Sequence, residues 1–170
     1  EFLFETGKLA GQADGAVLAR LGDTVVLATA VMSREAREGI DFFPLLVDYE
    51  ERLYAAGKIK GSRFIKREGR PQDDAILSGR LIDRTIRPRF NNKIRHEIQV
   101  VLTVLSFDKE NDPDVWGIFS ASLALSLSDI PWSGPVAAVR VGKVDNKYIS
   151  DPTYAQREKS ELDLIVSGTE

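Results

Sequence analysis

Short runs of apolar and β-branched residues, separated by turn residues, recur along most of the chain. Such runs predict strands, because branched and aromatic side chains fit a pleated, half-buried surface. The pair Gly22-Asp23 between two of these runs is typical of a tight hairpin turn. We expect strands over residues 16–21, 24–31, 42–49, 98–107, 136–144, 147–149 and 162–166.

Two segments have the spacing of helices instead. Residues 71–74 (Pro-Gln-Asp-Asp) predict a helix start, with carboxylates at the positive end of the helix dipole, and Pro88 predicts its end near Ile86. Residues 112–114 (Asp-Pro-Asp) open a second helix that runs from Val115 to about Ser128. One side of this helix carries small residues that allow close packing: Gly117, Ser120, Ala121 and Ala124. The order β-rich, α, β, α, β-rich predicts an α+β fold of mixed β-sheets packed with helices.

The composition is that of one globular domain. The chain has 170 residues, of which 43% are hydrophobic, enough for a sizeable core. No apolar stretch approaches the ~18 residues that a membrane span needs, and no signal peptide is recognisable. The lack of cysteine excludes disulfides and thiolate sites, and it fits a cytoplasmic setting. The first residue is not methionine and the chain stops just after an apolar run, so we expect a fragment of a longer protein.

The net charge of −3 conceals a strong asymmetry. Residues 58–95 contain twelve Lys or Arg and four acids, a net charge of +8, which leaves −11 for the rest of the chain. A basic band on an acidic body indicates a polyanionic partner, although a solvated charged face gives the same pattern.

Within the first helix, Arg80, Arg84 and Arg87 fall on one stripe, opposite the apolar positions. A functional interpretation makes them contacts to phosphate or RNA beside Arg70. A structural interpretation pairs them with acids such as Asp83. We favour the structural interpretation for Arg84 and Arg87, and all four arginines stay candidates for phosphate binding.

The segment 61–71 places an aromatic residue among cations. Single-stranded RNA binding uses this combination, because rings stack on bases while cations hold phosphates. The candidates for RNA binding are Arg63, Phe64, Lys66, Arg67 and Arg70. The alternative is that Phe64 only anchors the loop to the core. No familiar catalytic motif is present, His96 has no predicted ligand partner, and Trp116 and Trp132 are expected in the core or at an interface.

The sequence also resembles a known family. Six stretches carry the resemblance to the first core domain of bacterial polynucleotide phosphorylases, and they follow the same order in that family. They are residues 41–45 (DFFPL), 54–59 (YAAGKI), 67–71 (REGRP), 81–88 (LIDRTIRP) and 124–131 (ALSLSDIP), with 162–169 (LDLIVSGT) as a sixth. The resemblance implies a ribonuclease PH-type domain over residues 1–170, a homotrimeric ring, and RNA that threads through a central pore.

The resemblance also implies which residues remain functional. Phe64 and the cations Lys66 and Arg67 match the pore loop, whose second aromatic is replaced by Ile65, with Arg63 as an apparent insertion. We therefore expect this loop to bind RNA less tightly, because it has one aromatic ring fewer on which a base can stack. Base–aromatic stacking is typically worth ~1–3 kcal/mol per base.

The catalytic positions of the family are largely replaced. Arg70 matches a phosphate-binding arginine, but Asp114 stands where a second phosphate-binding group is expected. Asp163 matches one metal-binding aspartate, whereas Arg157 and Ile165 stand at the positions of the other aspartate and of the lysine. The resemblance therefore implies a domain without catalytic or metal-binding residues of its own, in an enzyme whose Mg²⁺ site lies elsewhere.

The full-length protein implied by these matches degrades RNA from its 3′ end with inorganic phosphate and releases nucleoside diphosphates, reversibly. Its expected partners are single-stranded RNA, phosphate, nucleoside diphosphates, two further subunits and an RNA-degradation complex, with no membrane. Two rival readings stay open: a non-catalytic RNA-binding or scaffold module, and a self-sufficient single-domain ribonuclease PH or exosome-ring subunit. A phosphorolysis assay on the isolated chain separates them.

Overall fold

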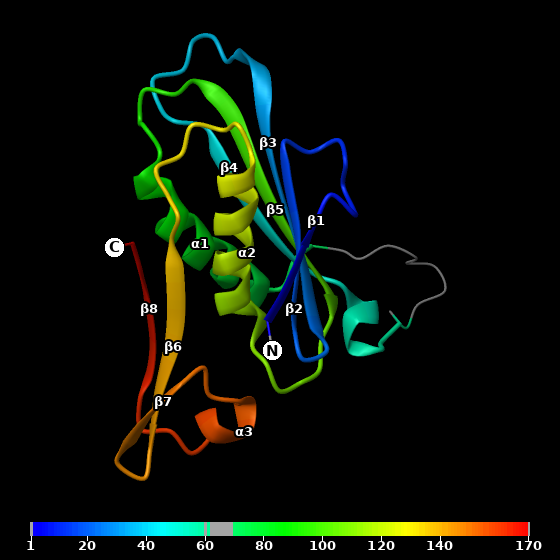
Figure 1. The fold of residues 1–170 in the computed structure, drawn as a ribbon, viewed down its shortest axis with the longest axis vertical. Coiled ribbons are helices and arrows are strands. Elements are labelled where there is room, and N and C mark those ends of the chain that lie inside the picture. The colour runs from blue at the N-terminus through cyan, green and yellow to red at the C-terminus, as the bar shows by residue number, and fades with distance from the viewer. Residues whose placement is uncertain (1, 60, 62–69, 170) are drawn as a thin grey trace.

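The computed structural model describes residues 2–59, 61 and 70–169, and these form two β-sheets and two main helices (Figure 1). The larger sheet has five strands in the order β1-β2-β3-β5-β4. All its neighbours are antiparallel except β4 and β5, which run parallel. The strands are β1 (Phe2–Thr6), β2 (Gly15–Leu21), β3 (Thr24–Ala36), β4 (Leu45–Glu51) and β5 (His96–Ser106).

The parallel pair is possible because a helix connects its strands. After β4 and the short 3₁₀ helix η1 (Leu53–Ala56), the chain forms α1 (Asp73–Ile86) and η2 (Arg87–Arg89) before it returns as β5. Parallel neighbours need a crossover connection of this kind, whereas antiparallel ones can be joined by a turn. The crossover therefore places α1 beside the edge strand β4.

The core lies between one face of the larger sheet and the helices α1 and α2 (Pro113–Leu127). On β5, Ile98, Val100 and Leu102 have no exposed surface, while the alternate positions are more open. Both helices lie against this face, since a Cβ placed on Gly117 of α2 would meet Ile82 of α1 at 3.0 Å and Leu102 at 3.2 Å. The alternating burial is that of a sheet covered by helices on one side.

The predicted small-residue side of α2 makes the closest helix–sheet contact. Ser120, Ala121 and Ala124 are fully buried. A Cβ added to Gly15 of β2 would lie only 2.1 Å from the Ala124 carbonyl oxygen. Glycine is thus required at position 15 because the helix backbone occupies the space that a side chain would take.

A second sheet follows α2 and has the order β7-β6-β8. Its strands are β6 (Ala137–Val144), β7 (Lys147–Ser150) and β8 (Asp163–Gly168), and both pairings are antiparallel. Asp145 and Asn146 join β6 to β7 with φ angles of 48° and 63°, the left-handed geometry of a tight hairpin turn. The hairpin contains the two strands predicted over residues 136–144 and 147–149. The short helix α3 (Tyr154–Arg157) precedes β8, as Figure 1 shows below the two main helices.

The α+β architecture is as expected from the sequence, and each predicted helix and strand is present. The observed β3 is longer than predicted, and β4 starts three residues later than expected. Four elements were not predicted: β1, η1, η2 and α3. Among the described residues, no helix combines the length and the apolar character that crossing a bilayer requires.

Candidate functional site

A cluster of arginines and aspartates lies where β6, β8, α3 and the start of α2 meet. Arg140 of β6 is its centre, with only 8% of its surface exposed. Its Nε donates to Asp163 Oδ1 at 2.6 Å and its Nη2 to Asp163 Oδ2 at 2.9 Å, while its Nη1 donates to Asp112. The guanidinium therefore binds two carboxylates at once, and its two bonds to Asp163 form the bidentate geometry that arginine favours.

A second guanidinium completes this cluster. Arg157 Nη1 donates to Asp112 Oδ2 at 2.5 Å, and Arg157 Nη2 reaches Asp163 Oδ2 at 3.4 Å. The capping box formed by Thr153 and Gln156 fixes α3, and the ring of Tyr154 lies 5.1 Å below the Arg157 guanidinium carbon. Two positive charges thus neutralise two negative ones. We call these four residues the Arg140 cluster: Asp112, Arg140, Arg157 and Asp163.

The N-terminus of α2 connects this cluster to α1. Asp112 caps the helix by accepting a hydrogen bond from the Asp114 N–H at 3.1 Å. Asp114 in turn accepts one from Ser78 Oγ of α1 at 2.7 Å. The helix therefore begins at the predicted place, and the side chains of Asp112 and Asp114 also hold two helices and a sheet together.

Acidic groups accumulate on the α1 side of the Arg140 cluster. Burial, reinforced by Asp112, raises the pKa of Asp114 to about 6. Burial together with Asp74 and Asp112 also raises the pKa of Glu51. The Tyr49 hydroxyl is buried with no hydrogen-bond partner among the described residues, and burial raises its pKa. This region disfavours additional negative charge.

On the other side, the pKa of Asp163 is held below its ordinary value, first by the hydrogen bonds from Arg140 and then by the charge of Arg157. Its carboxylate oxygens are already bound by guanidinium groups, so they do not fit a Mg²⁺ ion, which needs oxygen ligands in octahedral geometry. Within the described ranges, no group of three or more potential ligand side chains could hold a metal ion.

The arginine stripe of α1 divides into two kinds of residue. Arg87 Nε and Nη2 bind the Asp83 carboxylate at 3.0 and 2.7 Å, and Nη2 also donates to the Leu45 carbonyl at 3.1 Å. The structural interpretation holds for Arg87. It is not supported for Arg84, which is exposed and makes no ion pair with any described residue. Arg80 is likewise exposed and unpaired within the described part.

The predicted RNA-binding segment includes four residues that lie outside the described part of the chain: Arg63, Phe64, Lys66 and Arg67. Their assignment stays a prediction. Arg70 is described, and its exposed side chain is close in sequence to Gln72, the N-cap residue of α1.

Sequence reasoning found Asp112, Asp114, Arg157 and Asp163 but not Arg140. The available signal was the alternation Ala138-Arg140-Gly142, which places a charge among the buried positions of β6. The expectation for the two tryptophans was met: Trp116 is buried, and the Trp132 Nε1–H donates to the Ile86 carbonyl at 3.2 Å. The His96 Nδ1–H donates to the Ser33 carbonyl at 2.9 Å.

Two family models together match almost the whole chain and give its class. Residues 1–131 match the first domain of the 3′ exoribonuclease family, and residues 134–170 match its second domain. The chain therefore belongs to the 3′ exoribonuclease family. It is 62% identical over 170 residues to a polyribonucleotide nucleotidyltransferase of Pseudothermotoga lettingae, and 62% identical over 165 residues to that of Heliobacterium modesticaldum.

These relatives are much longer than the chain. The alignment covers 100% of this chain but 24% of the Pseudothermotoga protein, so the chain spans about a quarter of its relatives' length. Among solved structures, rice (Oryza sativa) Rrp46 matches with a TM-score of 0.74 at 16% identity, over 100% of this chain and 81% of that one. The Archaeoglobus fulgidus exosome with RNA bound to the active site matches with a TM-score of 0.69 at 18% identity, over 98% of this chain and 72% of that one. These structural likenesses show the fold.

Proposed function

We propose that the chain is the first ribonuclease PH-like domain of a polyribonucleotide nucleotidyltransferase, and that it binds single-stranded RNA and helps close a ring of subunits without cleaving RNA itself. Similarity along the whole chain to proteins of that name supports the assignment. The Arg140 cluster is the observation that supports an RNA-binding domain without cleavage activity of its own, because its two arginines bind the carboxylates that a metal ion would need.

In this proposal, catalysis belongs to a second ribonuclease PH-like domain outside residues 1–170. There, inorganic phosphate attacks the 3′-terminal phosphodiester, the bond to the preceding nucleotide breaks, and a nucleoside diphosphate leaves. Mg²⁺ bound in that domain would neutralise charge. We further propose a cytoplasmic homotrimer that joins an RNA-degradation complex.

The RNA surface would be the loop 63–67 with Arg70, extended by the exposed Arg84 on α1. Arg87 is already bound to Asp83, so its guanidinium supports the fold rather than a ligand. The acids Asp74, Asp112 and Asp114 disfavour phosphate at the helix starts, so RNA should follow the loop instead.

Titration of the chain with unstructured RNA at several salt concentrations tests this surface. Replacing Lys66 and Arg67 together by Ala should weaken binding across sequences and reduce the salt slope by roughly 0.7 per lost phosphate contact. The matched control is the pair Lys147→Ala and Lys159→Ala, two exposed lysines outside the basic band. If both double variants keep the wild-type slope, the loop does not contact the RNA backbone.

A further inference from the structure

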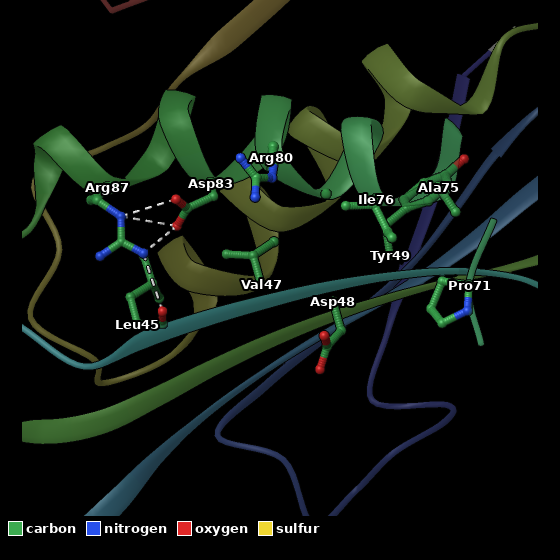
Figure 2. Close-up of a pocket in the computed structure, with 11 residues that line it drawn as sticks. Leu45, Val47, Asp48, Tyr49, Pro71, Ala75, Ile76, Arg80, Asp83 and Arg87 are labelled. Carbon is green, nitrogen blue, oxygen red and sulfur yellow. Dashed lines mark hydrogen bonds and ion pairs between the residues drawn. The ribbon is translucent and has the colours of Figure 1, made fainter. Parts of the chain in front are cut away.

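The larger sheet has one covered edge and one open edge. At the covered edge α1 lies along β4 (Figure 2), and a Cβ added to Gly79 would lie 3.6 Å from the Val47 carbonyl oxygen and 3.7 Å from the Tyr49 nitrogen. At the other edge, β1 pairs with β2 alone among the described strands. The Phe2 and Leu3 side chains are 52% and 51% exposed, although they point to opposite faces of the sheet. The helices therefore leave β1 uncovered on both faces.

The hairpin between β2 and β3 determines which backbone groups of β1 face the open edge. The residues on either side of its two-residue turn exchange backbone hydrogen bonds, so Arg20, one position earlier on β2, directs its groups at Leu3 of β1. The direction alternates along a strand. The N–H and C=O groups that point away from the sheet are therefore those of Phe2, Phe4 and Thr6. No residue in the described part of the chain forms a backbone hydrogen bond with them.

The open strand is held in place by aromatic packing and has little net charge. The Phe2 ring lies 4.4 Å from that of Trp116 at the start of α2, and Trp116 stacks on Phe119 at 5.5 Å. The charge of Glu5 is paired with Lys8 at 3.1 Å. The edge is thus ordered, apolar and nearly neutral, which suits another apolar strand better than a polyanion such as RNA.

We propose that β1 pairs with β1 of a second copy of the chain, in an antiparallel register centred on Phe4. An exposed edge strand is a template for such pairing with another chain. The twofold axis would be perpendicular to the sheet, so Phe4 would lie opposite its own copy on the face that bears α2. The remaining pairs would be Phe2 with Thr6 and Leu3 with Glu5.

This register satisfies the open edge better than its neighbour does. All the outward backbone groups gain partners, whereas a register centred on Leu3 would leave those of Thr6 without one. The two Glu5 carboxylates do not face each other, and the aromatic pair of Phe4 side chains at the axis adds to the stability of the contact.

The proposed contact differs from those that would close a homotrimeric ring. A twofold contact uses the same surface patch on both copies, whereas a threefold ring joins two different patches. The inference therefore does not rest on the proposed function, and either can fail while the other holds.

Single-cysteine variants test the register, because the sequence contains no cysteine. Phe4→Cys would place two Cα atoms about 5.5 Å apart, within disulfide reach, so mild oxidation should yield a covalent dimer. Leu3→Cys is the matched control, a similarly exposed neighbour on the same strand whose two copies would be diagonal neighbours about 7–8 Å apart. We expect the covalent dimer to form about tenfold faster in Phe4→Cys. Equal rates, or a faster reaction of Leu3→Cys, would overturn the proposal.

Charge variants test the contact in solution. Sedimentation at increasing concentration should show dimers of the wild-type chain. Phe4→Glu and Phe4→Lys should each weaken dimerisation about tenfold or more, because like charges would meet at the axis, and an equimolar mixture of the two should restore it. The control Tyr148→Glu, at a 74% exposed aromatic residue of β7, should leave dimerisation unchanged.

Melting curves show whether the charge variants fold, and the cysteine pair decides the matter if they do not. A wild-type chain that stays monomeric contradicts the proposal, as does a mixture of Phe4→Glu and Phe4→Lys that fails to dimerise. A trimer that Phe4→Cys does not cross-link also contradicts it, and that result would leave the proposed ring intact.

Discussion

Arg140 and Asp163 are bound to each other across the antiparallel pair β6–β8, through two hydrogen bonds of 2.6 and 2.9 Å. Asp163 is about half exposed, whereas Arg140 lies in the interior beside the start of α2. Burial disfavours a guanidinium charge, but the hydrogen bonds and charges of the aspartates outweigh it and raise the pKa of Arg140. Arginine side chains thus supply the positive charge that a bound cation would provide in a metal site.

Replacing Arg140 by Met should destabilise the chain by about 3 kcal/mol, because Asp112 then stays buried with one guanidinium partner fewer. Urea unfolding followed by circular dichroism measures the loss. The control is Arg20→Met, which breaks an ion pair with Asp23 whose two side chains are 52% and 79% exposed. The control should cost less than about 1 kcal/mol. Equal losses in both variants would contradict a structural role for the Arg140 cluster.

Stability should depend on Asp114 between pH 4 and pH 6. Its pKa is about 6 in the folded chain and 3.8 ordinarily, so in this window the folded state holds a proton that the unfolded state has lost. Stability therefore falls as the pH rises through the window, and the loss is complete above pH 6. Asp114→Asn keeps an oxygen for Ser78 and should raise stability at pH 7 by up to about 3 kcal/mol, with no gain near pH 4.

The exposed Asp129→Asn variant serves as the control for this experiment, since it removes the same charge from the surface. Urea unfolding at several pH values should give a flatter profile for Asp114→Asn than for the wild type and the control. A profile that keeps its wild-type slope would show that Asp114 does not titrate in this range.

Arg84 and Arg87 should respond differently to replacement by Ala. Arg87→Ala loses the Asp83 pair and the bond to Leu45, and the partly exposed position limits the cost to about 1 kcal/mol. Arg84→Ala should change stability by less than about 0.5 kcal/mol and should weaken RNA binding. Melting curves and one RNA titration per variant measure both effects. Marked destabilisation by Arg84→Ala would restore the ion-pair interpretation for that residue.

The chain alone should release no nucleoside diphosphate from RNA in the presence of phosphate and Mg²⁺, since Asp163 is bound by two guanidinium groups. Release of diphosphate from an unstructured RNA is measured chromatographically, with a full-length relative as the positive control. Turnover that disappears in Asp163→Asn would favour a self-sufficient ribonuclease instead.

The sequence by itself determined the two main helices, most of the strands and the family. Three kinds of signal act locally: the acids and prolines at the helix starts, the small residues of α2 and the Gly22-Asp23 turn. Capping, dihedral preference and helical spacing depend on near neighbours. For the same reason α3 was missed: four residues are too short for a periodic pattern, and a capping box together with the Arg157 pairs holds them in place.

Only the tertiary structure decided which charged side chains pair with one another. The sequence placed Arg84 and Arg87 on one stripe, yet Arg87 meets Asp83 and Leu45 while Arg84 faces solvent, because β4 lies beside only part of α1. Likewise, Asp112 and Arg140 are 28 residues apart in the sequence, yet they form an ion pair in which only 10% of each side chain is exposed. Charge pairs between distant segments depend on how sheets and helices pack, and local sequence preferences carry no information about that packing.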